Sequence, residues 1–85
     1  MTKLEKKLQE LGYEQNEFTL NYWGKEMEND CRFKKIIYLN NQFTEIKGHK
    51  VTPYCAFRTQ QDIDDLQQAF KEMQRDLEVL KEYEN

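Results

Sequence analysis

Residues 59–85 read TQQDIDDLQQAFKEMQRDLEVLKEYEN, and this stretch decides the fold. Residues 59–62 have the composition of a helix start, and neither glycine nor proline interrupts residues 60–83. The large apolar residues recur at spacings of 3, 4, 3, 4 and 3, which predicts one long amphipathic helix with these residues in the core. They are Ile63, Leu66, Phe70, Met73, Leu77 and Leu80.

The length of this helix bears on how the protein works. A helix over residues 60–83 would reach roughly 36 Å, whereas a strand of about six to eight residues spans about 20–27 Å. We therefore expect the helix to extend past the sheet on which it packs. Its apolar stripe is either a core stripe or a seam for self-association. For the second alternative we expect a homodimer, with its contact at Leu77, Leu80 and Tyr83.

A second, shorter helix is predicted at the N-terminus. Thr2 and Glu5 have the spacing of a capping box, in which each side chain binds the backbone amide of the other residue. Leucines then recur on one face, and Gly12 stands where a helix-ending glycine belongs. A helix of about ten residues is marginal alone, so we expect packing to hold it in place.

Between the two helices the apolar residues change to a period of two, which indicates strands. Short polar connections favour antiparallel neighbours, and Pro53 argues for an edge strand or a bulge. The expected fold is α+β: one domain over residues 1–85, with an antiparallel meander of three to four strands and both helices on one face. The expected strands are Phe18–Trp23, Cys31–Leu39, Phe43–Lys47 and Val51–Arg58.

Composition and motifs exclude several classes of protein. With 85 residues, 34% of them charged and 13% aromatic, the chain is a small polar domain whose aromatic content argues against disorder. No stretch approaches the roughly 20 apolar residues of a membrane span, and no secretory signal is present, so we expect a cytoplasmic protein. Catalytic motifs, phosphate-binding loops and metal-ligand spacings are absent. We therefore expect neither an enzyme nor a metal or other cofactor.

Charge is distributed unevenly along the chain. Residues 32–58 carry six basic side chains against Glu45 alone, whereas residues 59–85 carry eight acidic and three basic side chains. One interpretation is internal complementarity, with acidic helices lying near a basic sheet. The other is an acidic face that binds a partner protein. The residues expected on that face are Asp62, Asp64, Asp65, Glu72 and Asp76.

Strand alternation predicts a ligand site on the sheet. If alternate residues face the helices, the remaining residues share a face that no helix covers. Aromatic side chains there can stack bases, and lysine or arginine can neutralise phosphate. The net charge of −3 and a pI near 5.2 argue against general binding of duplex DNA. The residues expected to bind a nucleotide or nucleic acid are Trp23, Arg32, Lys34, Tyr54 and Arg58.

Both ends of the chain resemble a group of small phage proteins. Residues 61–70, QDIDDLQQAF, and 73–80, MQRDLEVL, are similar to the C-terminal helix of mostly uncharacterised proteins from phages and prophages of Gram-positive bacteria. Residues 4–13, LEKKLQELGY, resemble the start of those proteins. The resemblance transfers no functional residue. It implies a protein that acts on host machinery by binding, and anti-defence proteins are one such class.

Two functions from different classes follow. The first is an anti-defence protein without catalytic activity, which either occludes a host immune effector such as a CRISPR nuclease or sequesters a nucleotide immune signal. Acidic helices suit occlusion of a basic nucleic-acid channel, and a basic aromatic sheet suits capture of a nucleotide. The second is a small structural or regulatory interaction module of phage replication or transcription. The expected partner is a host defence protein or a nucleotide signal, and both remain open at this point.

Overall fold

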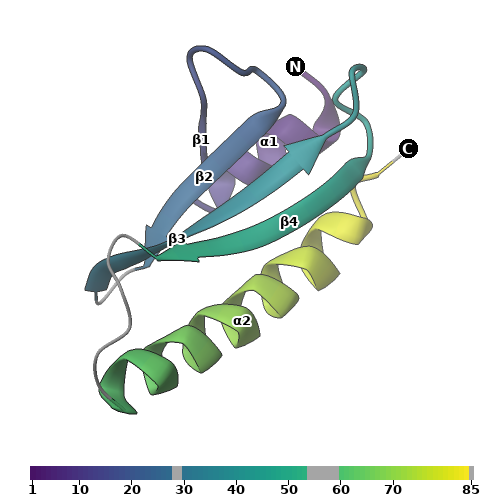
Figure 1. Ribbon diagram of the computed structural model, residues 1–85. Coiled ribbons are helices and arrows are strands. Elements are labelled where there is room, and N and C mark those ends of the chain that lie inside the picture. The colour runs from purple at the N-terminus through teal and green to yellow at the C-terminus, as the bar shows by residue number, and fades with distance from the viewer. Residues whose placement is uncertain (28–29, 54–59, 85) are drawn as a thin grey trace.

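The chain folds into two helices and a four-stranded sheet (Figure 1). The computed structural model describes residues 1–27, 30–53 and 60–84, of which 27 and 30–32 by their backbone alone. All strand pairs are antiparallel and follow sequence order, so the sheet is a meander and the expected α+β class is confirmed. The elements are α1 (Lys3–Glu10), β1 (Glu14–Gln15), β2 (Tyr22–Met27), β3 (Asp30–Leu39), β4 (Ile46–Pro53) and α2 (Gln60–Lys81).

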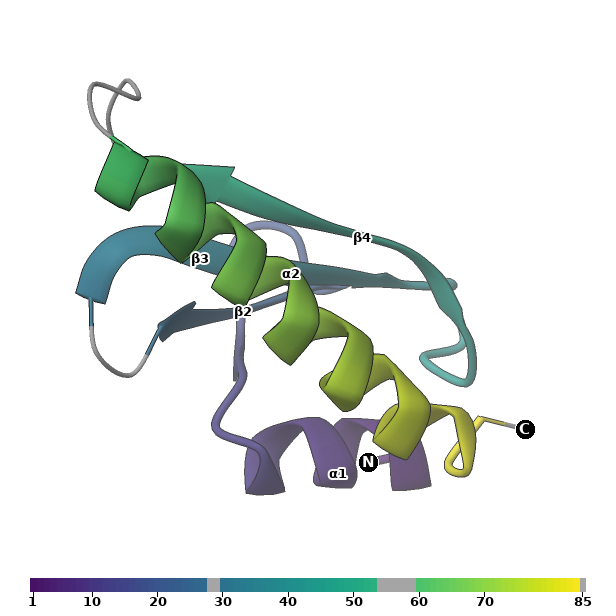
Figure 2. The ribbon, with the colours of Figure 1, turned by 90° about the horizontal axis from the view of Figure 1, so that it is seen from below.

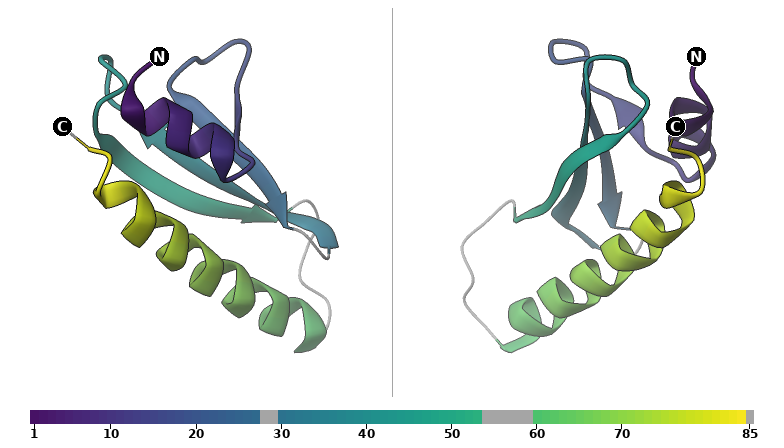
Figure 3. Two further views of the ribbon diagram at one scale, coloured as in Figure 1. Left: turned by 180° about the vertical axis from the view of Figure 1, so that it is seen from behind. Right: turned by 90° about the vertical axis from the view of Figure 1, so that its right-hand side faces the viewer.

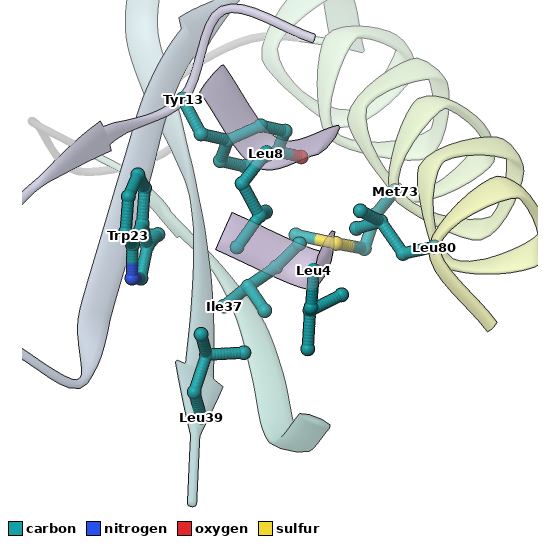
Figure 4. Close-up of a cluster of buried hydrophobic side chains, with 8 residues drawn as sticks. All are labelled: Leu4, Leu8, Tyr13, Trp23, Ile37, Leu39, Met73 and Leu80. Carbon is teal, nitrogen blue, oxygen red and sulfur yellow. The ribbon is translucent and has the colours of Figure 1, made fainter. Parts of the chain in front are cut away.

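Both helices lie on the same face of the sheet (Figures 2 and 3). Leu8 from α1, Ile37 from β3 and Met73 from α2 are all buried in one apolar cluster. Successive side chains of a strand point to opposite faces of the sheet, so the sheet has a second face that is turned away from this cluster. Because both described helices lie on the first face, no helix of the described residues covers the second. Figure 4 shows the cluster, which consists of Leu4, Leu8, Tyr13, Trp23, Ile37, Leu39, Met73 and Leu80.

The short helix α1 forms as its sequence predicts. The Thr2 hydroxyl oxygen accepts a hydrogen bond from the Glu5 amide at 3.1 Å, and the Glu5 carboxylate accepts one from the Thr2 amide at 3.0 Å. The Thr2 hydroxyl also donates to the carbonyl of Phe43 at 2.6 Å, which ties the start of α1 to the turn before β4. Gly12 follows the helix at a φ of +95°, a conformation that favours glycine.

The strand expected at Phe18–Trp23 begins later, at Tyr22. The Asn16 carboxamide oxygen accepts hydrogen bonds from the backbone amides two and three residues ahead, each at 2.8 Å, and so holds a turn. Phe18, expected in the core, is 93% exposed. Trp23, expected on the open face, is only 1% exposed and packs in the core. A shift of one residue turns every side chain of a strand to the other face, so this part of the prediction is wrong.

A single strand, β4, replaces the two strands expected at Phe43–Lys47 and Val51–Arg58. Gly48 lies inside β4, next to an irregularity in its pairing with β3, which is a usual place for a strand glycine. The residues before β4 form a turn, in which Asn40 Oδ1 accepts hydrogen bonds from backbone amides four and five residues ahead at 2.8 and 3.2 Å. Residues 54–58 of the expected fourth strand lie outside the described residues.

The long helix α2 forms as expected, but the face it buries is rotated from the expected stripe. Ile63 and Phe70 are 44% and 49% exposed, so the placement of Phe70 in the core is wrong. Ala69 is fully buried instead, and its small side chain allows a close approach to the sheet. The apolar stripe is two rows wide; this approach turns one row to the sheet and leaves Ile63 and Phe70 of the other row exposed. The row that faces the sheet consists of Leu66, Met73 and Leu80.

Candidate functional site

The candidate site is the outer face of the sheet, which is the face turned away from both helices. The register places alternate residues of β2, β3 and β4 side by side in three rows across the strands. Each row begins on β2, continues on β3 and ends on β4. The rows are Tyr22, Tyr38 and Gly48; Gly24, Ile36 and Lys50; and Glu26, Lys34 and Thr52.

Two tyrosines and a lysine form the aromatic part of this face. The rings of Tyr22 and Tyr38 meet edge to face, with centroids 4.3 Å apart and planes at 78°. The Lys50 ammonium lies 5.6 Å from the centroid of the Tyr38 ring. Its hydrogen bond with the Tyr38 side chain raises the pKa of this exposed lysine above the ordinary value. Tyr22 is 39% exposed, so an exposed ring and a cation lie in neighbouring rows of this face.

A small hollow lies beside the tyrosines. It has a volume of about 120 Å³, and it is lined by residues 14–16 and 22–24 together with Lys34 and Ile36. A side chain at position 24 would collide with the stem of Lys34, so the glycine lets Lys34 lie across β2. The glycine therefore leaves room for the Lys34 stem and places a cation at the border of the hollow.

The outer face is divided by charge. Lys34 and Lys50 lie on β3 and β4, whereas Glu14 and Glu26 lie on β1 and β2. Glu14 pairs with Gly24 and therefore points to this same face. A ligand that carries hydrogen-bond donors at one end and negative charge at the other matches this polarity.

The residues expected to bind a nucleotide are only partly on this face. Lys34 is there, as predicted. Trp23 is not, because it lies in the core, and its place as a stacking residue is wrong. The side chain of Arg32, and the whole of Tyr54 and Arg58, lie outside the described residues.

The sequence reading missed Tyr22, Lys50 and the hollow at Gly24. All three follow from the strand start at residue 22 and from a β4 that runs through residue 50. The available signal was Asn16, whose side chain favours a turn over a strand at the residues that follow it. That turn would have moved the strand start to Tyr22, whereas the face that Tyr22 takes is set by the burial of Trp23 in the core.

The acidic residues expected on a protein-binding face are largely engaged within the molecule. Lys35, which is 4% exposed on the inner face of β3, lies 2.9 Å from Asp76 and 3.8 Å from Glu72. The Tyr13 hydroxyl donates a hydrogen bond of 2.5 Å to the same Asp76 carboxylate. The Lys35 ammonium also lies 5.7 Å from the Tyr13 ring. Internal complementarity therefore accounts for Glu72 and Asp76.

The first turns of α2 hold the other three acidic residues of that set. Asp62 is 7% exposed and makes interactions inside the molecule. Asp64 and Asp65 accept hydrogen bonds from Gln60 and Gln61 one turn earlier, at 3.2 and 2.9 Å. The five acidic side chains therefore do not form one free surface. Asp64 is exposed, and its part in binding a partner protein stays a prediction.

The residues expected at a homodimer contact also lie in the protein's own core. Leu80 is fully buried, and Leu77 and Tyr83 pack against the same cluster. The Lys7 ammonium covers the Tyr83 ring at 5.3 Å from its centroid. Leu80 is therefore not available for self-association, whereas Leu77 and Tyr83 are only partly buried and their assignment to such a contact stays a prediction. The homodimer itself stays a prediction.

A second, larger hollow lies on the helix side of the molecule, between β4 and α2. Its volume is about 510 Å³, and both acidic and basic side chains line it, as well as His49 and Leu77. Across the described ranges, no group of three or more histidine, cysteine, aspartate and glutamate residues is arranged to hold a metal ion. Neither described helix is long and apolar enough to cross a membrane.

Comparison of the chain with family models, with curated proteins and with solved structures gives no match. The function must therefore be argued from the geometry of the molecule itself.

We expect Tyr13→Phe to flatten the loss of stability at alkaline pH. Burial, and then the hydrogen bond to Asp76, raise the pKa of the Tyr13 phenol well above the ordinary value of 10.0. Above that ordinary value the unfolded chain releases the proton while the folded chain keeps it. The contribution of Tyr13 to the free energy of unfolding is therefore complete below pH 10. Above pH 10 it is lost, by at most about 1.4 kcal/mol per pH unit.

Urea denaturation at about pH 8, 10 and 11 measures this effect. Tyr13→Phe should be less stable than the wild type at pH 8, because it lacks the hydrogen bond to Asp76, but should lose less stability between pH 10 and 11. Tyr22→Phe, at a partly exposed site, should follow the wild type. Equal alkaline losses in the wild type and Tyr13→Phe would contradict a buried neutral phenol.

Proposed function

We propose that this chain is a phage-type binding protein without catalytic activity, which sequesters a nucleotide signal on the outer face of its sheet. The observation that carries the proposal is the Tyr22–Tyr38 pair on a face without a covering helix, with Lys50 in the next row and Lys34 in the row after it. The resemblance at the two ends of the chain supplies the context, since nucleotide immune signals are one target of phage anti-defence proteins.

The chemistry of the face suits a nucleotide. An exposed tyrosine ring can stack a base, at about 1–3 kcal/mol per base in single-strand-binding proteins. Ammonium groups beside the ring can hold phosphate, and Lys50 already lies against the Tyr38 ring. A face of three short strands is small, and its two glutamates would repel the regular phosphate rows of a duplex. A single nucleotide or a short nucleotide signal therefore fits better than duplex DNA.

Occlusion of a host effector by the acidic helix has less support. Asp62 is buried, and Glu72 and Asp76 surround Lys35, so the carboxylates that would replace phosphates already have partners. A structural or regulatory module of phage replication or transcription remains the alternative if no nucleotide binds.

Calorimetric titration with a panel of nucleoside monophosphates and cyclic dinucleotides tests the proposal. We expect Tyr22→Ala to weaken nucleotide binding roughly 5- to 150-fold through the lost stacking. Higher salt should weaken the binding further, because the lysine–phosphate contacts are exposed. Phe18→Ala is the matched control, since it removes an exposed aromatic ring from the loop before β2 and should leave affinity unchanged.

Recovery of the ligand separates binding from catalysis. After incubation and heat release, chromatography should return the nucleotide unchanged and in equal amount. A converted nucleotide would make the protein an enzyme. The absence of binding across the panel, or equal affinity in the wild type and Tyr22→Ala, would reject the outer face as a nucleotide site.

A second candidate function is assembly with another copy of this chain. Ile63 and Phe70 form an exposed apolar row on α2, and within the described residues β4 pairs with β3 alone. In an isologous dimer, the apolar row on α2 can pack against the same row of the second copy. The free edge of β4 can pair with β4 of that copy, so that the two sheets join. This contact differs from the one expected from the sequence.

We expect Phe70→Glu to abolish such a dimer, because a carboxylate would be buried at the contact. Val79→Glu is the control, since Val79 is also partly exposed but lies half a turn around the helix from Phe70. Sedimentation equilibrium measures both variants. A wild type that stays monomeric at high concentration, or a dimer that survives Phe70→Glu, would contradict this arrangement.

A further inference from the structure

The hollow at Gly24 has the size of one part of a nucleotide. Its volume of about 120 Å³ is well below the about 300–1,000 Å³ of pockets that enclose whole drug-sized ligands. It can therefore hold a ring system while the rest of the ligand stays outside. Tyr22 and Ile36 give it apolar walls, which suit the faces of a base rather than a sugar or a phosphate.

Few of the polar side chains around the hollow are free to form hydrogen bonds with a ligand. The Gln15 side-chain amide donates to the Leu20 carbonyl at 2.9 Å. The Asn16 side-chain oxygen accepts two backbone hydrogen bonds in the turn that precedes β2. Glu14 and Lys34 make no side-chain hydrogen bond or ion pair with any other described residue. Trp23 also lines the hollow, and its indole N–H has no hydrogen-bond partner among the described residues, but Trp23 is only 1% exposed. At the open side of the hollow, a carboxylate and an ammonium are therefore the groups left to meet the edge of a base.

We propose that the hollow selects guanine, an inference that rests on the proposed function. A carboxylate only accepts hydrogen bonds, through two oxygens side by side. Guanine presents two adjacent donors, its N1–H and N2–H groups, and the Glu14 carboxylate takes both. The Lys34 ammonium donates to O6, which stands beside N1–H, and to N7 on the adjoining edge of the base. Adenine and cytosine present an acceptor beside their amino group, and uracil has a single donor between two acceptors.

The polarity of the outer face orients the remainder of the ligand. With the base edge at Glu14, the phosphate lies away from β1 and toward β3 and β4. Lys50 stands on that side, in the same row as Gly24, and receives the phosphate. This orientation keeps the phosphate away from Glu14 and Glu26. Base and phosphate thus meet opposite charges of one divided face.

Titration of the wild type with GMP, IMP and AMP tests the inference. IMP differs from GMP only by the missing N2 amino group, so it isolates half of the contact to Glu14. We expect GMP to bind roughly 5- to 150-fold more tightly than AMP, with IMP between them. Glu14→Gln should bring the three affinities to within about twofold of one another. Glu26→Gln changes the net charge equally on the same face and should keep the preference for GMP.

The outcomes separate this inference from the proposed function. Binding of all three nucleotides with equal affinity, or a guanine preference that survives Glu14→Gln, would overturn the guanine site and leave nucleotide binding intact. The absence of binding by any of them would overturn both. Far-ultraviolet circular dichroism and thermal unfolding confirm that the two variants are folded, as expected for a substitution at the exposed position 14.

Discussion

The ion pair between Lys35 and Asp76 is the interaction on which the arrangement of the helices depends. Lys35 stands on the inner face of β3 at 4% exposure, where removal of its partner would cost about 3–5 kcal/mol. Asp76 meets it from α2 at 2.9 Å and also accepts the hydroxyl of Tyr13, which follows α1. One carboxylate thus joins the sheet, the long helix and the segment after the short helix. Neither Lys35 nor Tyr13 can keep its hydrogen bond if α2 leaves this face.

This arrangement leaves one face of the sheet uncovered by the described helices. The helices cover the inner face, where Trp23 and Ile37 are buried, so the outer face presents only what the strands carry. Those side chains are sorted, with glutamates on the first two strands, lysines on the last two and a tyrosine pair beside the central hollow. Internal complementarity and ligand binding were alternatives for the charge pattern of the sequence. In the folded chain they fall on opposite faces: the helix carboxylates meet Lys35 inside, and Lys34 and Lys50 lie on the outer face.

Structural features set by residues close together in the sequence were predictable, and features set by contacts between distant residues were not. Helices follow from local signals, so the capping box of α1 and the length of α2 were predictable. Strand register was not, because it depends on whether Asn16 holds a turn, and an error of one residue exchanged Trp23 for Tyr22 on the outer face. The buried side of α2 was also misplaced, since Ala69 and a lysine on a distant strand select it rather than the largest apolar residues. The candidate site is an assembly of three strands, and of the five residues expected to bind a nucleotide only Lys34 is seen there among the described side chains.

The central claim is that the outer face of the sheet, and not the helix side, is the working surface. Nuclear magnetic resonance tests it most directly, through amide shifts of the labelled protein during titration with GMP. The account predicts shifts at Tyr22, Gly24, Ile36 and Tyr38, which share the outer face, with little change along α2. Shifts concentrated at His49 and Leu77, which line the hollow between β4 and α2, would contradict it. So would a spectrum that GMP leaves unchanged.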